Sequence, residues 1–155
     1  MKRFILCVLG NILMFPNTVA GLLPLAYLRL IGSVRLSKPS RWALLAVAVP
    51  DKWLSRKMSS GGWAGFAVGP VMFVSAKHAE SDRTLVHEER HVLQQMVFGV
   101  FQPILYVLIS VFIWCFIWTK HSYYDNPFER DARRAAGQRI DIPKHFWKGD
   151  RWAWW

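Results

Sequence analysis

The sequence predicts an α+β fold: a mainly helical core with a short β-hairpin before its principal helix, preceded by an N-terminal membrane segment. Three observations predict this fold. An uncharged apolar run occupies residues 4–28. Two short runs of small, aromatic and β-branched residues, 64–68 and 71–75, are typical of paired strands. Two later polar segments, beginning near residues 81 and 126, carry helix-start signals.

The composition indicates contact with a membrane. Of the 155 residues, 53% are hydrophobic and 19% are charged, whereas a soluble domain has about 25% charged residues. This high hydrophobic and low charged content excludes a disordered, collagen-like or coiled-coil chain. The net charge of +10 and the nine Trp favour an anionic membrane surface as a partner, and no motif predicts specific nucleic-acid binding. Cys7 and Cys115 lie in apolar runs and form neither a disulfide framework nor a metal pattern.

The first third of the chain is expected to anchor the protein. The run at 4–28 is long enough to cross a bilayer, and we interpret residues 1–31 as a retained membrane segment. A cleaved signal peptide is the alternative, but the apolar character continues beyond the small residues near position 20. Residues 32–61 are interpreted as a basic interfacial linker, or alternatively as a solvated loop with a short packed helix. Their density of Lys and Arg predicts that the active site faces the cytoplasm.

The next segments read as a helix followed by an apolar stretch. Ser81 or Asp82 is the expected cap of a helix that continues towards Phe101, where Gln102-Pro103 interrupts it. The apolar stretch 104–119 would form a helix about 24 Å long, which is short of the bilayer core of about 30 Å. Counted from residue 96, the uncharged run is long enough to span, so its length alone leaves a crossing or a folded-back arm open.

A second polar helix follows. Asn126 is a good N-cap, Pro127 suits the first helical position, and Glu129 lies at the capping-box position. Gly137 is the expected end of this helix. Residues 140–155 form a basic, Trp-rich tail, which is either an interfacial anchor or a segment packed on the protein's own surface.

One motif carries chemistry: residues 87–91 read His-Glu-Glu-Arg-His, an H-E-x-x-H pattern. Residues four apart share a helix face, so His87 and His91 can bind one Zn²⁺ ion. Glu88 lies beside them and can act as the general base that takes a proton from the attacking water. A surface helix with a charge cluster and two incidental histidines is the alternative.

A zinc site needs a third protein ligand. The candidates are Glu129, His78, His121 and Asp125. If the run from residue 96 crossed a bilayer, His91 and Glu129 would lie on opposite sides and could not share a metal. The Pro103 break favours a folded-back arm, and the motif therefore outweighs the simple hydropathy interpretation.

A Leu-Val-His-Glu-x-x-His-x-x-x-Gln helix, an apolar connection, a Tyr and then Asn-Pro-Phe-Glu-Arg-Asp-Ala together resemble the gluzincin type of zincin metallopeptidase. The similarity is greatest to small bacterial and phage-type members, and it covers about residues 62–137 of a zincin-like core at 62–139. It implies that Glu129 is the third ligand and that the strands at 64–75 border the cleft. One position departs from the pattern: Arg133 stands where an acidic residue would orient a ligand histidine, and the nearby Asp131 lies at a different helical angle.

These observations predict a membrane-associated zinc metallopeptidase that hydrolyses a peptide or protein substrate. An oxyanion needs a donor opposite the metal, and four aromatic residues are candidates. They are Tyr106, His121, Tyr123 and Tyr124, whose alternative role is that of interfacial aromatics. The alternative function is a non-enzymatic membrane interaction protein with a degenerate zincin-like scaffold. A two-span membrane protein with a chance motif is a third possibility.

Overall fold

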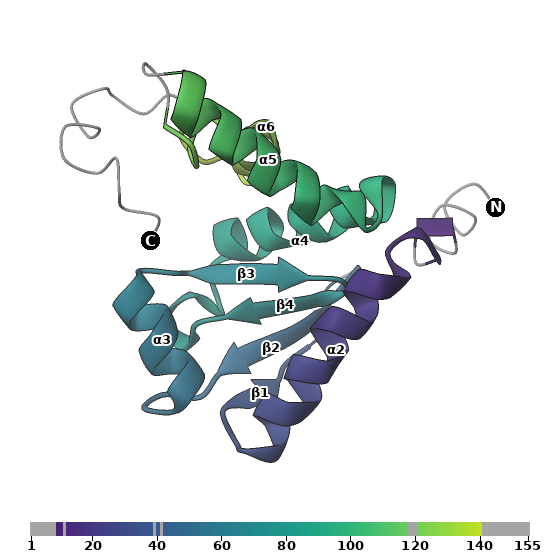
Figure 1. Ribbon diagram of the computed structural model, residues 1–155. Coiled ribbons are helices and arrows are strands. Elements are labelled where there is room, and N and C mark those ends of the chain that lie inside the picture. Colours follow the sequence, from purple (N-terminus) through teal and green to yellow (C-terminus); the bar gives the residue numbers. More distant parts are fainter. Residues whose placement is uncertain (1–8, 11, 39, 41, 118–120, 141–155) are drawn as a thin grey trace.

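A mixed four-stranded sheet forms the centre of the computed structural model, which describes residues 9–10, 12–38, 40, 42–117 and 121–140 (Figure 1). The strand order is β1-β2-β4-β3, with β2 and β4 parallel and the two outer pairs antiparallel. The strands are β1 Val34–Leu36, β2 Leu44–Ala48, β3 Gly65–Val68 and β4 Val71–Val74. The helices among the described residues are α2 Phe15–Leu30, α3 Trp53–Gly61, α4 Asp82–Phe98, α5 Phe101–Phe116 and α6 Pro127–Ala135, with a 3-10 turn, η1, at Ala76–His78. The α+β class and the β-hairpin before the motif helix are confirmed.

Both faces of the sheet are covered, so its central strands are apolar on both sides. Phe73 of β4 packs with Leu28 of α2 and Met58 of α3 on one face. On the other face, Val74 of β4 packs with Val92 of α4. This burial explains why β4 consists of four apolar residues with no alternation. The motif helix α4 is thereby fixed against the sheet.

The segment interpreted as a basic linker, residues 32–61, forms β1, β2 and α3 in the structure. Half of the sheet therefore precedes the expected start of the core at residue 62. The apolar run of β2 is buried between two helical layers, and four of its five residues are buried. A strand covered on both faces shows no period-two pattern, and periodicity cannot distinguish such a short apolar run from a buried helix segment.

The predicted membrane segment is only partly described. Residues 15–30 form α2, with Pro16 in its first turn and Pro24 inside the helix. Among the described residues, no single helix is long and apolar enough to cross a membrane; α4 and α5 pass that test only as a pair, bent by 109°. Residues 1–8, which include Cys7, and the predicted tail beyond residue 140 lie outside the described residues.

The bend between α4 and α5 lies earlier than the sequence predicted. Helix α4 ends at Phe98, and Gly99 has a φ of 58°, a conformation that few residues other than glycine adopt. Pro103 does not break the helix but lies in the first turn of α5, where its missing N–H costs no hydrogen bond. The expectation of a break at Gln102-Pro103 is therefore corrected to Gly99. Residues 96–116 form an arm that turns back, and α6 then packs on α4.

The predicted helix caps are confirmed. The Ser81 side chain accepts a hydrogen bond from the Thr84 N–H at the start of α4, and Asn126 accepts one from the Phe128 N–H at the start of α6. Gly137 follows the end of α6 with a φ of 61°. Local capping chemistry thus determines where the two helices of the motif region begin.

Asn126 also connects α6 to α5. It is fully buried, and its Nδ2 donates to the Tyr106 carbonyl oxygen at 2.9 Å and to Ser110 Oγ at 2.8 Å. We expect Asn126→Ala to lower the free energy of unfolding by about 2–4 kcal/mol, because it removes a cap and leaves buried polar groups unpaired. Urea denaturation followed by circular dichroism measures the change. Asn126→Ser keeps a capping oxygen, so its free energy of unfolding should fall by roughly half as much as that of Asn126→Ala. Equal stability of the wild type and both variants would show that Asn126 does not stabilise the packing of α6 on α5.

Candidate metal centre

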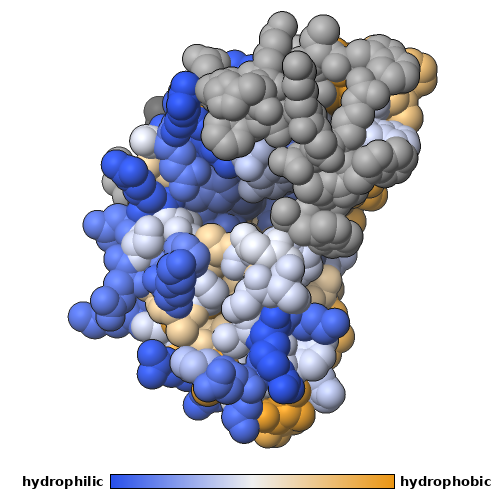
Figure 2. Space-filling view, turned by 90° about the vertical axis from the view of Figure 1, so that its left-hand side faces the viewer, coloured by the Kyte–Doolittle hydropathy of each residue, from blue (hydrophilic) through white to orange (hydrophobic). Residues whose placement is uncertain are grey.

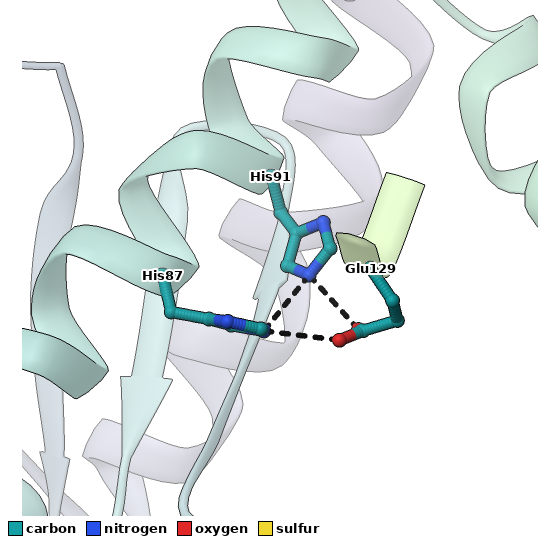
Figure 3. Close-up of side chains that lie close together, drawn as sticks. All are labelled: His87, His91 and Glu129. Atoms are coloured by element: carbon teal, nitrogen blue, oxygen red, sulfur yellow. Dashed lines mark hydrogen bonds and ion pairs between the residues drawn. The ribbon is translucent and has the colours of Figure 1, made fainter. Parts of the chain in front are cut away.

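Three predicted ligands meet between α4 and α6 (Figure 3). His87 and His91 are one turn apart on α4, and Glu129 lies in the first turn of α6. The His91 Nε2 atom is 3.2 Å from His87 Nε2 and 3.1 Å from Glu129 Oε1. The distance from His87 Nε2 to Glu129 Oε2 is 3.3 Å. The prediction that these three side chains converge is confirmed.

The group can hold a metal ion. All three side chains are buried, and Glu129 Oε2 is a buried oxygen that accepts no hydrogen bond from the described residues. Two imidazole nitrogens and one carboxylate oxygen match the donor set of a catalytic zinc site. With tetrahedral bonds of about 2.0–2.1 Å, neighbouring zinc ligands lie about 3.3–3.4 Å apart, close to the three distances observed.

The charges of the group favour an ionised carboxylate. Burial alone would raise the pKa of Glu129, but its close contacts with the His87 and His91 rings, and the charges of those rings, hold it well below its usual range. Burial opposes protonation of His91, whereas its hydrogen bond with Glu129 and the charge of that carboxylate raise its pKa overall. Glu129 is therefore present in the form that binds a metal.

Glu88 lies beside the ligands, against the edge strand β3. Its side chain is buried, and a Cβ atom added at Gly65 would come within 2.9 Å of Glu88 Oε1. Glycine at position 65 is thus required for the carboxylate to occupy this position. Burial raises the pKa of Glu88 to about 7, although the charges of His91 and His87 oppose the shift. A carboxylate with this pKa suits a general base near neutral pH.

A hydrogen-bond chain orients His91, and the sequence did not reveal it. His91 Nδ1 is 2.9 Å from Gln94 Oε1, and Gln94 Nε2 donates to Asp131 Oδ2 at 2.8 Å. Asp131 also accepts two hydrogen bonds from Arg90. The helical angle of Asp131 prevents direct contact with a ligand, but the carboxylate acts through Gln94. The only available signal was the spacing of Gln94, three residues after His91 on the same helix face.

Among the described residues, His87 has no hydrogen-bond chain like the one that orients His91. Its Nδ1 is buried and has no hydrogen-bond partner among the described residues. Arg133, at the position where an acidic residue was sought, places its Nε 3.9 Å from Glu129 Oε2. The guanidinium of Arg133 lies over the Tyr124 ring, 4.6 Å from its centroid. Arg133 thus stands where the gluzincin pattern has an acidic residue, and His87 is the ligand histidine whose Nδ1 has no partner among the described residues.

We expect Gln94→Ala to weaken zinc binding about 10–100-fold, because loss of an outer partner frees the His91 ring. Competition with a chromophoric chelator measures the dissociation constant. Gln138→Ala is the matched control, since the Gln138 side chain lines the same cleft and donates to the Arg83 carbonyl oxygen rather than to the hydrogen bonds that orient His91. Equal zinc affinity of the two variants would show that metal binding by His91 does not depend on its hydrogen bond with Gln94.

The group opens into a cleft of about 870 Å³. Its wall on one side is β3, and α4 forms the floor with His87, Glu88 and His91. The four candidate oxyanion donors Tyr106, His121, Tyr123 and Tyr124 also line it. Burial and the nearby Glu129 carboxylate raise the pKa of Tyr123 above its usual range, which keeps its hydroxyl protonated. The four side chains thus border the space in front of the ligands.

Individual contacts separate these candidates. The Tyr106 hydroxyl donates to Glu129 Oε1 at 3.3 Å, so it contacts the ligand group directly. His121 Nδ1 accepts from the Tyr123 N–H, which leaves Nε2 to carry the proton in a neutral ring. Of the four candidate third ligands, only Glu129 joins the group. His78 instead pairs with Ser75 Oγ, and Asp125 pairs with the His121 N–H.

No family model, curated protein or solved structure matches this chain.

Proposed function

We propose that the protein is a zinc metallopeptidase that hydrolyses peptide bonds with an activated water molecule. The observation that carries this proposal is the convergence of His87, His91 and Glu129 with Glu88 beside them in one cleft. Two ligands and a base from one turn of helix, completed by a carboxylate from a second helix, suit hydrolysis of a carbonyl compound. Zinc bound there would supply Lewis acidity and lower the pKa of the attacking water.

The chain's own residues have separate roles in this proposal. Glu88 takes a proton from the water as the water oxygen bonds to the substrate carbonyl carbon, and then passes that proton to the leaving amine nitrogen. The Tyr106, Tyr123 or His121 donors stabilise the negative charge on the carbonyl oxygen. The chain from Asp131 through Gln94 keeps His91 in a single orientation.

An extended peptide suits the edge of β3. The Ser75 N–H donates to the Ala64 carbonyl oxygen, so residues 64, 66 and 68 point their backbone groups at β4. By alternation, the backbone groups of Gly65 and Ala67 point the other way. The Ala67 carbonyl oxygen is taken by Gln95, whereas Gly65 adjoins Glu88 in the cleft. A substrate backbone paired at Gly65 would lie next to the proposed base.

The second candidate function is a non-enzymatic scaffold, and a specific feature favours it. Among the residues that the structure describes, none accepts a hydrogen bond from His87 Nδ1, and Arg133 occupies the position where an acidic residue would orient a ligand histidine. This alternative allows zinc to bind for stability. It predicts that no peptide is cleaved.

Metal analysis of the full-length protein, purified without chelators, tests the proposal. We expect about one zinc ion per chain, and cleavage of a mixed peptide library that stops on chelation and returns when zinc is added. Protein prepared in this way that contains no zinc would overturn the proposal. Stoichiometric zinc without cleavage would favour the scaffold.

A further inference from the structure

Helix α5 has buried polar side chains and exposed apolar side chains, the reverse of what is usual for a helix that faces water. Its polar side chains Gln102 and Ser110 are buried, and its Tyr106 hydroxyl reaches the ligand group. Most of its large apolar side chains are exposed instead, although Ile113 is buried. Those exposed are Phe101, Ile104, Val107, Leu108, Val111, Phe112, Trp114 and Phe116. The helix contains no charged residue. Such an arrangement places polar groups where water is excluded and apolar groups where a soluble protein meets water.

Helix α2 has a similar outer surface. Asn17 and Gly21 are buried in it along with Leu25 and Leu28, and Asn17 Nδ2 donates to the Gly99 carbonyl oxygen at 3.0 Å. The exposed apolar side chains of this helix are Phe15, Val19, Leu22, Leu23, Tyr27 and Leu30. Its one charged residue is Arg29, in the last turn.

The two helices meet at the bend between α4 and α5. Gly99 lies against the backbone of Leu13, since a Cβ added there would be 2.7 Å from the Leu13 carbonyl oxygen. Leu13 is exposed, as are Phe98 and Phe101, which lie within two residues of Gly99 in the sequence. We call this continuous surface, from α2 through the bend to α5, the α2–α5 face. Both helices lie on the near side in Figure 1, and the view from the left in Figure 2 is mainly hydrophilic, with hydrophobic residues towards its right-hand and lower edges.

We propose that the α2–α5 face is immersed in one leaflet of an anionic membrane. Lipid is the solvent that accepts an uncharged apolar helix whose polar groups are turned inward. The 16 residues of α5 extend about 24 Å, short of the bilayer core, and the 109° bend prevents α4 and α5 from crossing as one span. The net charge of +10 attracts the chain to anionic headgroups.

The proposal does not depend on metal binding. It does place the ligand group next to the membrane, because the inner side of α5 carries Tyr106, which contacts Glu129. A membrane-bound α5 would thus hold one wall of the cleft at the lipid surface.

Nitroxide labelling of the full-length chain tests the face. Single cysteines replace Ile104, Leu108 and Phe112 in a background with Cys7→Ser and Cys115→Ser, and Arg134→Cys on α6 is the control. With vesicles of phosphatidylcholine and phosphatidylglycerol (3:1), labels on α5 should collide several-fold more often with oxygen than with a water-soluble nickel complex. The label at 134 should show the reverse. Nickel access on α5, or shielding from both reagents by another protein copy or by the chain's own tail, would overturn the proposal.

Vesicle flotation provides a second measurement. Leu108→Glu with Phe112→Glu should lower the partition coefficient at least tenfold, because it removes two apolar side chains from the lipid-facing surface and places two charges in lipid. Arg134→Glu changes the net charge by the same amount on an exposed position of α6 and should stay within about threefold of the wild type. Equal partitioning of the double variant and the wild type would contradict immersion. Circular dichroism checks that each variant is folded.

Discussion

His87→Ala is expected to abolish stoichiometric zinc binding. The substitution removes one of three protein ligands and leaves only His91 Nε2 and Glu129, so the affinity should fall by on the order of 10³-fold or more. Metal content after gel filtration and chelator competition both measure the loss.

His78→Ala is the matched control for this prediction. His78 lies in η1 and pairs with Ser75 Oγ, outside the ligand group. Its loss should leave the zinc content unchanged. A His87→Ala protein that still carries one tightly bound zinc ion per chain would show that the metal occupies a different place.

The parts of the structure predicted correctly from the sequence depend on local chemistry. The cap at Asn126 fixes the start of α6, and that start places Glu129 in the first turn, facing α4. The spacing of His87 and His91 fixes their common face whatever the rest of the fold does. The strands on either side of Gly69 carried their own turn signal.

The parts that were missed depend on the fold as a whole. Strand β2 is apolar on both faces because α2 and α4 cover the sheet from opposite sides, and the apolar run 44–48 alone does not distinguish a buried strand from a buried helix segment. The contact of Gln94 with Asp131 joins residues 37 positions apart. No local rule predicts such a pair. Its existence follows from the packing of α6 on α4.

The bend at Gly99 explains why hydropathy and the motif seemed to conflict. Counted along the sequence, residues 96–119 are apolar for long enough to separate His91 from Glu129 by a membrane. The left-handed conformation of Gly99 turns the chain by 109° instead, and Asn126 then ties the start of α6 to α5 at Tyr106 and Ser110. The two polar helices therefore lie on the same side of the apolar arm, where a shared metal is possible.

Glu88→Gln is expected to retain zinc and to lower kcat/KM about 10²–10⁴-fold. Glutamine has nearly the same shape as glutamate and fits against Gly65, but its amide cannot accept a proton from the water. A loss of this size corresponds to about 3–5 kcal/mol of the activation barrier. Steady-state cleavage of a peptide identified from the library, with the zinc content measured in the same preparation, separates chemistry from metal binding.

Glu89→Gln is the control for this substitution, because it makes the same chemical change one residue further along α4. Successive residues of a helix are about 100° apart, so Glu89 points away from the ligands and its change should leave kcat/KM within about threefold of the wild type. Undiminished turnover in Glu88→Gln would assign the base to another residue. Equal losses in both variants with zinc retained would indicate damage to the helix. A loss confined to position 88 would leave Glu88 as the group that moves the proton.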